Sequence, residues 1–221
     1  MAKILITSGP TRQYLDPVRY LSNASSGRMG RSLARAAIGA GHEVTVVTGP
    51  VSVDYPPQCD VVRVVTTDEM MTATASKFQH FDGLIGAAAP CDYRPTTVQS
   101  SKMTKTGDPI EIELVETPDI VATLGGRKRD DQWVVGFALE TEDRRFRATV
   151  KLQRKCCDLI VSNGPSAIDA DDNEIEIIDP RGEVLLKASG QKDHLGKLIL
   201  FEIERRLIVA TPLPPSSSPV A

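Results

Sequence analysis

Short runs of apolar residues alternate with segments of helical periodicity along most of the chain. Continuous apolar runs rich in valine and isoleucine predict strands at residues 3–8, 43–48, 61–65, 83–88, 133–139 and 158–162. Apolar residues that recur every three or four positions predict helices at residues 28–40, 67–78, 118–124 and 142–156. Apolar strands joined by helices are typical of a parallel sheet that is covered on both faces. We therefore expect ligands to bind beyond the carboxyl ends of these strands.

The pattern changes after residue 163. Two short runs flank the turn-like sequence Asp-Pro-Arg-Gly and predict an antiparallel hairpin with strands at residues 174–178 and 184–187. Residues 192–207 predict a closing helix, and residues 211–221, rich in proline and serine, predict a disordered tail. The expected fold is α/β: a Rossmann-like parallel sheet with helices on both faces, plus a small C-terminal β-hairpin and the closing helix.

Length and composition narrow the class of protein. The chain has 221 residues, of which 41% are hydrophobic and 25% charged, and we expect one domain over residues 1–210. The formal net charge of −3 argues against a broad nucleic-acid surface. No apolar run approaches the ~20 residues of a membrane span, the N-terminus lacks a signal-peptide pattern, and the cysteines show no CxxC spacing. These features predict a cytoplasmic protein.

The loop at residues 16–30, between the first strand and the first helix, is the leading candidate for an anion site. It is rich in Ser, Asn and Gly, and the helix opens at residues 27–30. The N–H groups of a helix's first turn have no partner within the helix and suit a phosphate or carboxylate. Arg19 and Arg28 add positive charge, and the amide of Asn23 can both donate and accept hydrogen bonds.

A polar segment at residues 94–108 interrupts the alternation of strands and helices. It carries Lys102 and Lys105 and leads into residues 110–117, whose alternating pattern predicts a half-exposed strand. Such a segment is either a flap that closes over phosphates or a disordered loop with two solvated lysines. We favour the flap, because the lysines stand in an otherwise nearly uncharged segment.

Other candidate residues have both a functional and an ordinary explanation. Asp92, which follows the small residues at 87–89, either holds Mg²⁺ on a polyphosphate or caps a turn, and we weigh the two equally. Lys151 and Lys155 lie four apart on one helix face and are either phosphate ligands or surface charges. Phe137 is either an aromatic wall for a base or a core residue. The chain lacks GxxxxGK[ST] and GxGxxG, so the common nucleotide motifs support none of these roles.

Several distinctive stretches follow one another along the chain: TSGPTRQYLDPVRYLSNASSGRMG, VTVVTGPV, GAAAPCDYRP, KMTK, ETPDIV, VVGFALET and KLQRKCCDLIVSN. Taken in this order, they resemble phosphopantothenate–cysteine ligase, also called phosphopantothenoylcysteine synthetase. In most bacteria this enzyme is the C-terminal half of a bifunctional coenzyme A biosynthesis protein, so the resemblance implies a stand-alone form of that domain. It also implies that CTP activates the carboxylate of 4′-phosphopantothenate as an acyl-cytidylate, with Mg²⁺ on the triphosphate and release of pyrophosphate, before L-cysteine attacks.

The resemblance implies roles for particular residues. Asn23, Lys102 and Arg19 would be catalytic, with Lys102 at the phosphates. The nucleotide would contact Ala87, Ala88, Asp92, Lys102, Pro118, Asp119, Ile120, Val121, Phe137, Lys151 and Lys155. Phosphopantothenate would contact Asn23, Ser25, Ser26, Gly27 and Ala89. No protein metal site is expected, since Mg²⁺ would bind mainly through the nucleotide phosphates. The expected assembly is a homodimer with phosphopantothenate near the subunit interface, and a separate phosphopantothenoylcysteine decarboxylase is a candidate partner.

The sequence departs from the family pattern at a few positions. The flap motif, usually KxKK, has Thr104 in place of a lysine, which leaves less charge and makes Lys102 more important. Pro90 removes a backbone N–H beside the expected nucleotide site, and Leu139 stands where alanine is usual. None of these changes removes Asn23 or Lys102, so we still expect activity.

Two other classes of function compete with the ligase. A dinucleotide-dependent oxidoreductase on a similar sheet would need GxGxxG after the first strand and an acidic residue closing the second, and the chain has neither. A degenerate, non-catalytic nucleotide-binding scaffold would lose nothing if Lys102 were replaced. The choice between CTP and ATP depends on a few backbone contacts, and we favour CTP because the motifs resemble those of bacterial enzymes.

Overall fold

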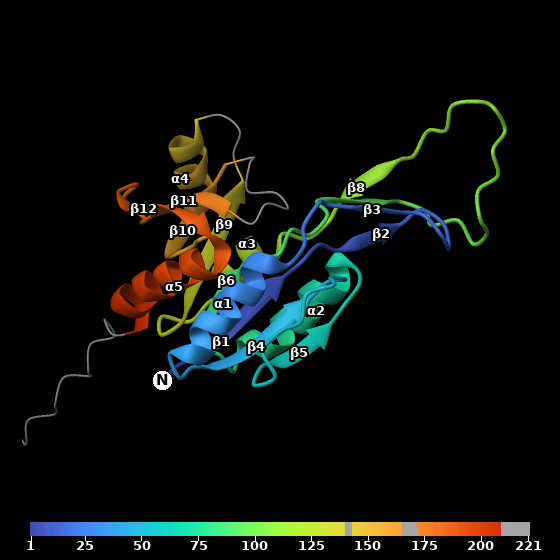
Figure 1. Cartoon of the computed structure of the whole chain (residues 1–221). Helices are drawn as coiled ribbons and strands as arrows, with labels where there is room; N and C mark the ends of the chain where they lie inside the picture. Colours follow the sequence, from blue (N-terminus) through green and yellow to red (C-terminus); the bar gives the residue numbers. More distant parts are fainter. Residues whose placement is uncertain (140–142, 165–171, 209–221) are drawn as a thin grey trace, which may run out of the picture.

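The computed structural model describes residues 1–139, 143–164 and 172–208, arranged around an eight-stranded sheet with the order β12-β11-β10-β9-β6-β1-β4-β5 (Figure 1). The strands are β1 Lys3–Ser8, β4 Glu43–Thr48, β5 Asp60–Arg63, β6 Gly83–Gly86, β9 Trp133–Leu139, β10 Leu159–Asn163, β11 Asp172–Ile178 and β12 Val184–Gln191. The six strands β10, β9, β6, β1, β4 and β5 pair with their neighbours in parallel. Strand β11 is antiparallel both to β10 and to β12. The expected α/β fold with a mainly parallel sheet is confirmed.

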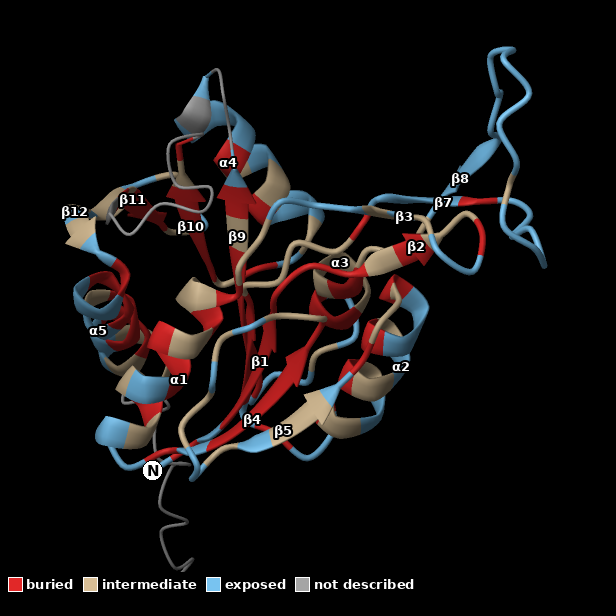
Figure 2. Ribbon diagram, turned by 45° about the vertical axis from the view of Figure 1, so that its right-hand side comes forward, coloured by how far each residue is buried: buried red, intermediate tan, exposed pale blue. Residues whose placement is uncertain are grey.

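Helices cover both faces of the sheet, which lies buried between them (Figure 2). They are α1 Arg28–Gly39, α2 Thr67–Phe78, α3 Ile120–Gly125, α4 Arg144–Arg154 and α5 Lys192–Ile203, and α5 continues into a π-helix, η2 Glu204–Ile208. On one face Leu33 of α1 and Leu195 of α5 join Ile6 in a buried cluster. On the other face Met70 of α2 joins Leu5, and α3 and α4 contribute to the same cluster. Adjacent residues of β1 therefore serve opposite cores, as the pleat of a strand requires.

Most predicted elements are confirmed, with small shifts at their ends. Those with the predicted bounds are the strands at 3–8, 43–48 and 133–139 and the helix at 67–78. The helix predicted at 118–124 begins at Ile120, because Asp119 is its N-cap and accepts a hydrogen bond from the Ala122 N–H at 3.0 Å. The first residue of the helix predicted at 142–156, and the tail predicted at 211–221, lie outside the described residues. No helix in the described part of the chain is long and apolar enough to cross a membrane.

The predicted C-terminal hairpin is confirmed, and it belongs to the main sheet, because β11 pairs with β10. The chain then returns through α5, which packs beside α1. Gly196 permits this close approach, since a Cβ there would lie 3.0 Å from the backbone of Ser32. Ser32 donates to Asp193 at 2.5 Å near the start of both helices, and His42 lies 3.1 Å from Glu204 near their ends. The two helices therefore run side by side in the same direction.

A second region projects from the sheet as an arm, which the sequence pattern did not predict. It contains two antiparallel pairs, β2 Arg12–Tyr14 with β3 Tyr20–Ser22 and β7 Tyr93–Pro95 with β8 Leu114–Glu116. The strand predicted at 110–117 is thus shorter than expected, and part of the loop predicted at 16–30 is strand β3. Residues 96–113 form a long loop at the end of the arm (Figure 1), and nearly all of that loop is exposed (Figure 2).

Candidate functional site

The N-terminus of α1 lies beyond the carboxyl end of β1 and has no side-chain cap. Gly27 precedes the helix with a φ of 74°, and a Cβ at this position would lie 2.8 Å from Val51, so both backbone and space require glycine. The first turn contains no acidic residue. The first N–H groups of α1 have no partner within the helix, and an uncapped helix start of this kind suits an anion.

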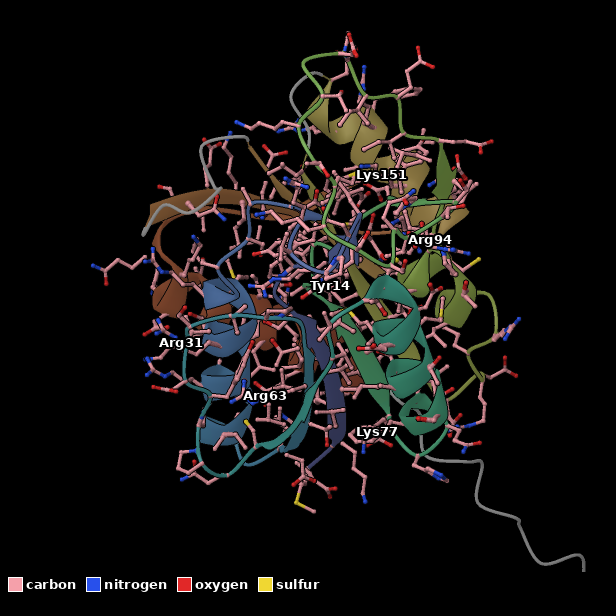
Figure 3. The ribbon with its side chains drawn as sticks, turned by 90° about the vertical axis from the view of Figure 1, so that its right-hand side faces the viewer. Tyr14, Arg31, Arg63, Lys77, Arg94 and Lys151 are labelled. Atoms are coloured by element: carbon pink, nitrogen blue, oxygen red, sulfur yellow. The ribbon has the colours of Figure 1, made fainter. Side chains whose placement is uncertain are left out.

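A cavity of about 480 Å³, which we call the first cavity, opens at this end of α1. The predicted substrate residues that line it are Asn23, Ser25, Ser26, Gly27 and Ala89, and the predicted nucleotide residues are Ala87, Ala88, Asp92, Phe137 and Lys151. Lys151 contributes from α4, well apart from Arg31 on the outer side of α1 (Figure 3). The fold thus brings together residues from segments that are far apart in the sequence.

A second cavity of about 270 Å³ adjoins the first. The two share Ala88, Pro90, Asp92 and Phe137. The remaining predicted nucleotide residues that line the second cavity are Pro118, Asp119, Ile120, Val121 and Lys155. All the residues predicted to contact the nucleotide, except Lys102, therefore line one cavity or the other.

The loop after β6 forms the wall between the cavities. The Ala87 N–H donates to Thr7 O at 3.2 Å, and the Ala89 N–H donates to Gly9 O at 2.9 Å. The Asn23 side chain donates to Ala89 O at 3.3 Å and to Pro90 O at 2.9 Å. The N–H groups of this wall are thus largely engaged with the end of β1, and its small side chains face the cavities. Asn23 joins the loop before α1 to this wall.

Three charged residues of the second cavity form ion pairs centred on Asp119. Lys155 Nζ lies 3.1 Å from Asp119, and Arg154 lies 3.7 Å from it. Burial alone would raise the pKa of Asp119, but the Ala122 N–H and the nearby Lys155 outweigh burial and hold the pKa below its usual value. Asp119 therefore stays charged, caps α3 and fixes the position of Lys155 at the cavity wall.

Arg19 and Lys102 do not line either cavity. Arg19 lies 2.5 Å from Asp16 and donates to Met103 O at 3.0 Å. Asp16 is fully buried and accepts from the N–H groups of Val18 and Arg19, each at 2.8 Å, and of Met103 at 3.1 Å. Burial opposes its ionisation, but these donors lower the pKa of Asp16 to about 2. We call Asp16, Arg19 and Met103 the clasp, because they fasten the loop that carries Lys102 to the β2–β3 hairpin.

The polar residues that line the first cavity without having been predicted are Asn163, Asn173 and Lys192. Asn163 ends a parallel strand, and that position marks a ligand-binding loop in such sheets, so the sequence contained an indication. Asn173 lies on antiparallel β11 and Lys192 begins α5. Nothing in the local sequence of either residue indicates that it reaches the end of α1.

Comparison with known proteins identifies related sequences. The model of the family described as DNA/pantothenate metabolism flavoprotein C-terminal domain matches residues 1–207. The chain is 42% identical over 210 residues to the coenzyme A biosynthesis bifunctional protein CoaBC of Escherichia coli (strain K12), covering 92% of this chain and 52% of that protein. It is 41% identical over 207 residues to CoaBC of Vibrio vulnificus (strain YJ016), covering 91% and 51%. The chain therefore spans about half the length of these curated relatives.

Solved structures share the fold. The crystal structure of the C-terminal domain of CoaBC has a TM-score of 0.80 and 36% identity, covering 94% of this chain and 96% of that chain. A Cab2 mutant in complex with phosphopantothenate-cysteine has a TM-score of 0.76 at 16% identity, covering 94% and 86%, and this likeness supports the fold alone. On the match over residues 1–207, the chain belongs to the family described as the DNA/pantothenate metabolism flavoprotein C-terminal domain.

Proposed function

We propose that this chain is a phosphopantothenate–cysteine ligase, which joins the carboxylate of 4′-phosphopantothenate to the amine of L-cysteine in coenzyme A biosynthesis. The observation that carries the proposal is the pair of adjoining cavities that share Ala88, Asp92 and Phe137. The larger one lies at the uncapped start of α1 and suits an anionic substrate. The smaller one, with residues 118–121 and Phe137 in its wall, suits a nucleoside. An activation reaction needs two such ligands held side by side.

The reaction has two steps. A carboxylate is a poor electrophile, so one of its oxygens first attacks the α-phosphorus of CTP, which forms an acyl-cytidylate and releases pyrophosphate. The amine of cysteine then attacks the acyl carbon, the amide forms, and CMP leaves. In this scheme Asn23 contacts the carboxylate and then the acyl phosphate, the start of α1 holds negative charge, and Lys102 stabilises the charge that develops on the phosphates. CTP is proposed over ATP on the likeness to bacterial CoaBC proteins.

The residues present fit a magnesium ion that arrives with the nucleotide. Among the described residues, no group of three or more His, Cys, Asp or Glu side chains could hold a metal unaided. Asp92 is exposed, and it is the carboxylate that the described linings of the two cavities share. Asp92 would therefore bind Mg²⁺ together with the triphosphate oxygens, and the ion would neutralise phosphate charge there.

We also propose that the active form is a homodimer, in which the arm of each chain carries Lys102 to the cavities of the other. Figure 1 supports this, since the loop at residues 96–113 extends away from the sheet of its own chain. Most of the exposed large apolar side chains in the described part of the chain belong to the arm: Val18, Tyr20, Tyr93, Val98, Ile110, Ile112, Leu114 and Val115. An exposed apolar surface of this kind marks an interaction site.

The proposal is tested by pyrophosphate release from the purified chain with 4′-phosphopantothenate, L-cysteine and Mg²⁺, supplying CTP or ATP in parallel. We expect release with CTP that requires phosphopantothenate. Without cysteine, release should stop after about one equivalent per site, because the acyl-cytidylate then has no amine to react with. Release with ATP but not with CTP would support the same ligase reaction with ATP as the nucleotide in place of CTP.

Variants separate an enzyme from a nucleotide-binding scaffold. Lys102→Gln should lower the rate of release by about 10²–10³-fold, since it removes a charge that acts on the transition state. Lys105→Gln, on the same exposed loop, is the matched control and should have a much smaller effect. A folded wild-type dimer that releases no pyrophosphate with either nucleotide would contradict the ligase and favour the scaffold.

A further inference from the structure

We propose that Thr67, the first residue of α2, is a positioning residue for the second cavity, because it helps to hold the backbone that carries Asp92. It acts together with Thr11 and Thr117, and we call these three residues the threonine cluster. The cluster itself is a feature of the fold. Its consequence for the reaction rests on the proposed function, in which Asp92 binds Mg²⁺ together with the triphosphate.

The cluster closes a ring of hydrogen bonds around the backbone of Cys91. The Cys91 N–H donates to Thr11 Oγ1 at 2.8 Å, and Thr67 Oγ1 donates to Cys91 O at 3.1 Å. Thr11 Oγ1 and Thr67 Oγ1 lie 2.8 Å apart. A hydroxyl has one proton, and that of Thr67 goes to Cys91 O, so Thr11 is the donor between the two threonines. Each of the two hydroxyls therefore both donates and accepts, and the ring runs in a single direction.

Thr117 extends this ring to Asp92. Its Oγ1 also donates to Cys91 O, at 2.6 Å, and its N–H donates to Asp92 O at 2.8 Å. Cys91 O and Asp92 O lie on either side of the Asp92 Cα. The backbone from which the exposed Asp92 side chain begins is therefore fixed at the second cavity, which that residue lines.

The ring is closed off from solvent and from the ligand sites. Thr11 and Thr67 are fully buried and Cys91 is 4% exposed, so water is not available to replace a lost partner. In the described linings of both cavities, neither Thr11 nor Thr67 appears. Thr67 is not the N-cap of α2 either, because Thr66 and Glu69 form the capping box of that helix. The Thr67 hydroxyl therefore serves the cluster.

The cluster lies where the arm joins the sheet. Thr11 directly precedes β2 and Thr117 directly follows β8, whereas Thr67 begins a helix that is packed on the sheet. Cys91 Sγ donates to Leu21 O at 3.5 Å, which adds β3 to the same joint. The loop between β6 and β7 is therefore bonded to both hairpins of the arm and to α2, and Thr67 is the member of the cluster that belongs to α2.

The test is the steady-state kinetics of pyrophosphate release by the full chain at varied concentrations of CTP, Mg²⁺ and 4′-phosphopantothenate. Thr67→Val keeps the shape of the side chain and removes the hydroxyl. It should lower kcat/KM for CTP about tenfold and raise the Mg²⁺ concentration needed for half of the maximal rate, because Asp92 is held less firmly. The KM for phosphopantothenate should stay near its wild-type value, since the start of α1 has no part in the cluster.

Thr74→Val is the matched control, because Thr74 is also fully buried on α2 and its hydroxyl donates to Met70 O of the same helix at 2.6 Å. It should leave the kinetics with CTP and Mg²⁺ unchanged, whatever its effect on the melting temperature. Thr67→Ser keeps the hydroxyl and should restore most of kcat/KM. Thr11→Val opens the ring on its other side and should reproduce the effect on CTP, which keeps the proposal testable if Thr67→Val does not fold.

Binding of CTP with Mg²⁺, measured by isothermal titration calorimetry, tests the positioning role separately from the ligase. Weaker binding in Thr67→Val but not in Thr74→Val would support the role even in a chain that releases no pyrophosphate. An active wild type whose CTP and Mg²⁺ kinetics are unchanged in the folded Thr67→Val and Thr11→Val variants would overturn the role and leave the ligase standing. Equal losses in Thr67→Val and Thr74→Val would also overturn it, since they would show a contribution to stability alone.

Discussion

The sheet and the arm of this molecule are built in different ways. In the sheet, Ile4, Leu5 and Ile6 of β1 are fully buried, and each face is covered by helices. In the arm, the strands have three residues each, and Tyr93 and Ile112 are 49% and 43% exposed. The sheet is stabilised by burial of apolar surface, whereas the arm depends on short ladders and on the polar clasp around Asp16.

The sheet and the arm therefore have different tasks in the proposed reaction: the sheet holds the ligands, and the arm carries Lys102. The sheet fixes most of both cavities, since their walls come mainly from the ends of its parallel strands and from the helices packed on it, and Tyr93 and Glu116 at the base of the arm complete the second cavity. The arm carries Lys102 on a loop that does not contact either cavity of its own chain. A rigid sheet is suited to holding two ligands together, and an exposed arm is suited to contacting a second chain.

The largest expected effect is on the stability of the sheet. Ile6→Ala should lower the free energy of unfolding by about 2–5 kcal/mol, because it leaves a cavity in a fully buried core. Ile112→Ala in the arm should change it by less than about 0.5 kcal/mol. Urea denaturation of both variants measures the contrast, and equal losses would contradict the division between sheet and arm.

The next effect is on association. The double variant Ile112→Glu/Leu114→Glu places two charges on the exposed face of the arm and should weaken the dimer about 100-fold, because charged groups would be desolvated at the interface. Phe201→Glu, at an apolar residue of α5 that is 57% exposed, is the control and should not weaken it. Sedimentation velocity over a range of concentrations gives the dissociation constants. If the double variant dissociates with the wild-type constant, the dimer interface does not include this face of the arm.

A smaller effect is expected from the clasp. Asp16→Asn should lower kcat/KM about tenfold, because the loop that carries Lys102 is no longer held in one position. The pKa of Asp16 is lowered from 3.8 to about 2, so the charged carboxylate stabilises the clasp above pH 3.8, and this contribution is lost as the pH falls toward 2. Hydrogen exchange at Met103 should therefore become faster over that pH range in the wild type.

In Asp16→Asn the exchange at Met103 should be fast already at neutral pH and nearly independent of pH below 4, apart from the intrinsic chemistry of exchange. Slow, wild-type exchange at Met103 in this variant would show that the clasp does not hold the loop.

The smallest effect is expected at the cap of α3. Asp119→Ala removes the acceptor of the Ala122 N–H and should cost about 1 kcal/mol of stability. Asp119→Asn keeps an acceptor and should recover most of that loss. Thermal unfolding distinguishes the two variants, and equal melting temperatures would mean that pairing with Lys155, rather than capping, is the contribution of Asp119.

The sheet could be predicted from the sequence because its pattern is local. The strands at residues 3–8 and 133–139 are continuous apolar runs, and their order along the chain implies helical crossovers. The same logic located the cavity wall at residues 87–89, which follows a parallel strand, whereas residues 118–121 were assigned through the family resemblance.

The arm could not be predicted in this way. In β2 the one buried residue is Gln13, so no apolar pattern marks the strand, and the partner of β7 lies beyond a loop at residues 96–113. Arg19 was assigned to the anion site because its charge is evident in the sequence, whereas its engagement by Asp16 and Met103 depends on tertiary structure. The positions of Asn173 and Lys192 in the lining of the first cavity depend on how the hairpin and α5 pack, and no local pattern encodes that.

The most direct test of the shared site is to mix two variants that are each inactive, Asn23→Ala and Lys102→Ala, and to allow their subunits to exchange. If the arm of one chain serves the cavities of the other, random exchange makes half of the dimers mixed, each with one intact site, and restores about a quarter of the wild-type rate of pyrophosphate release. If each chain uses its own Lys102, every site in every dimer carries a substitution and no activity returns. Recovery is the result we predict, and a mixture as inactive as its parts would contradict it.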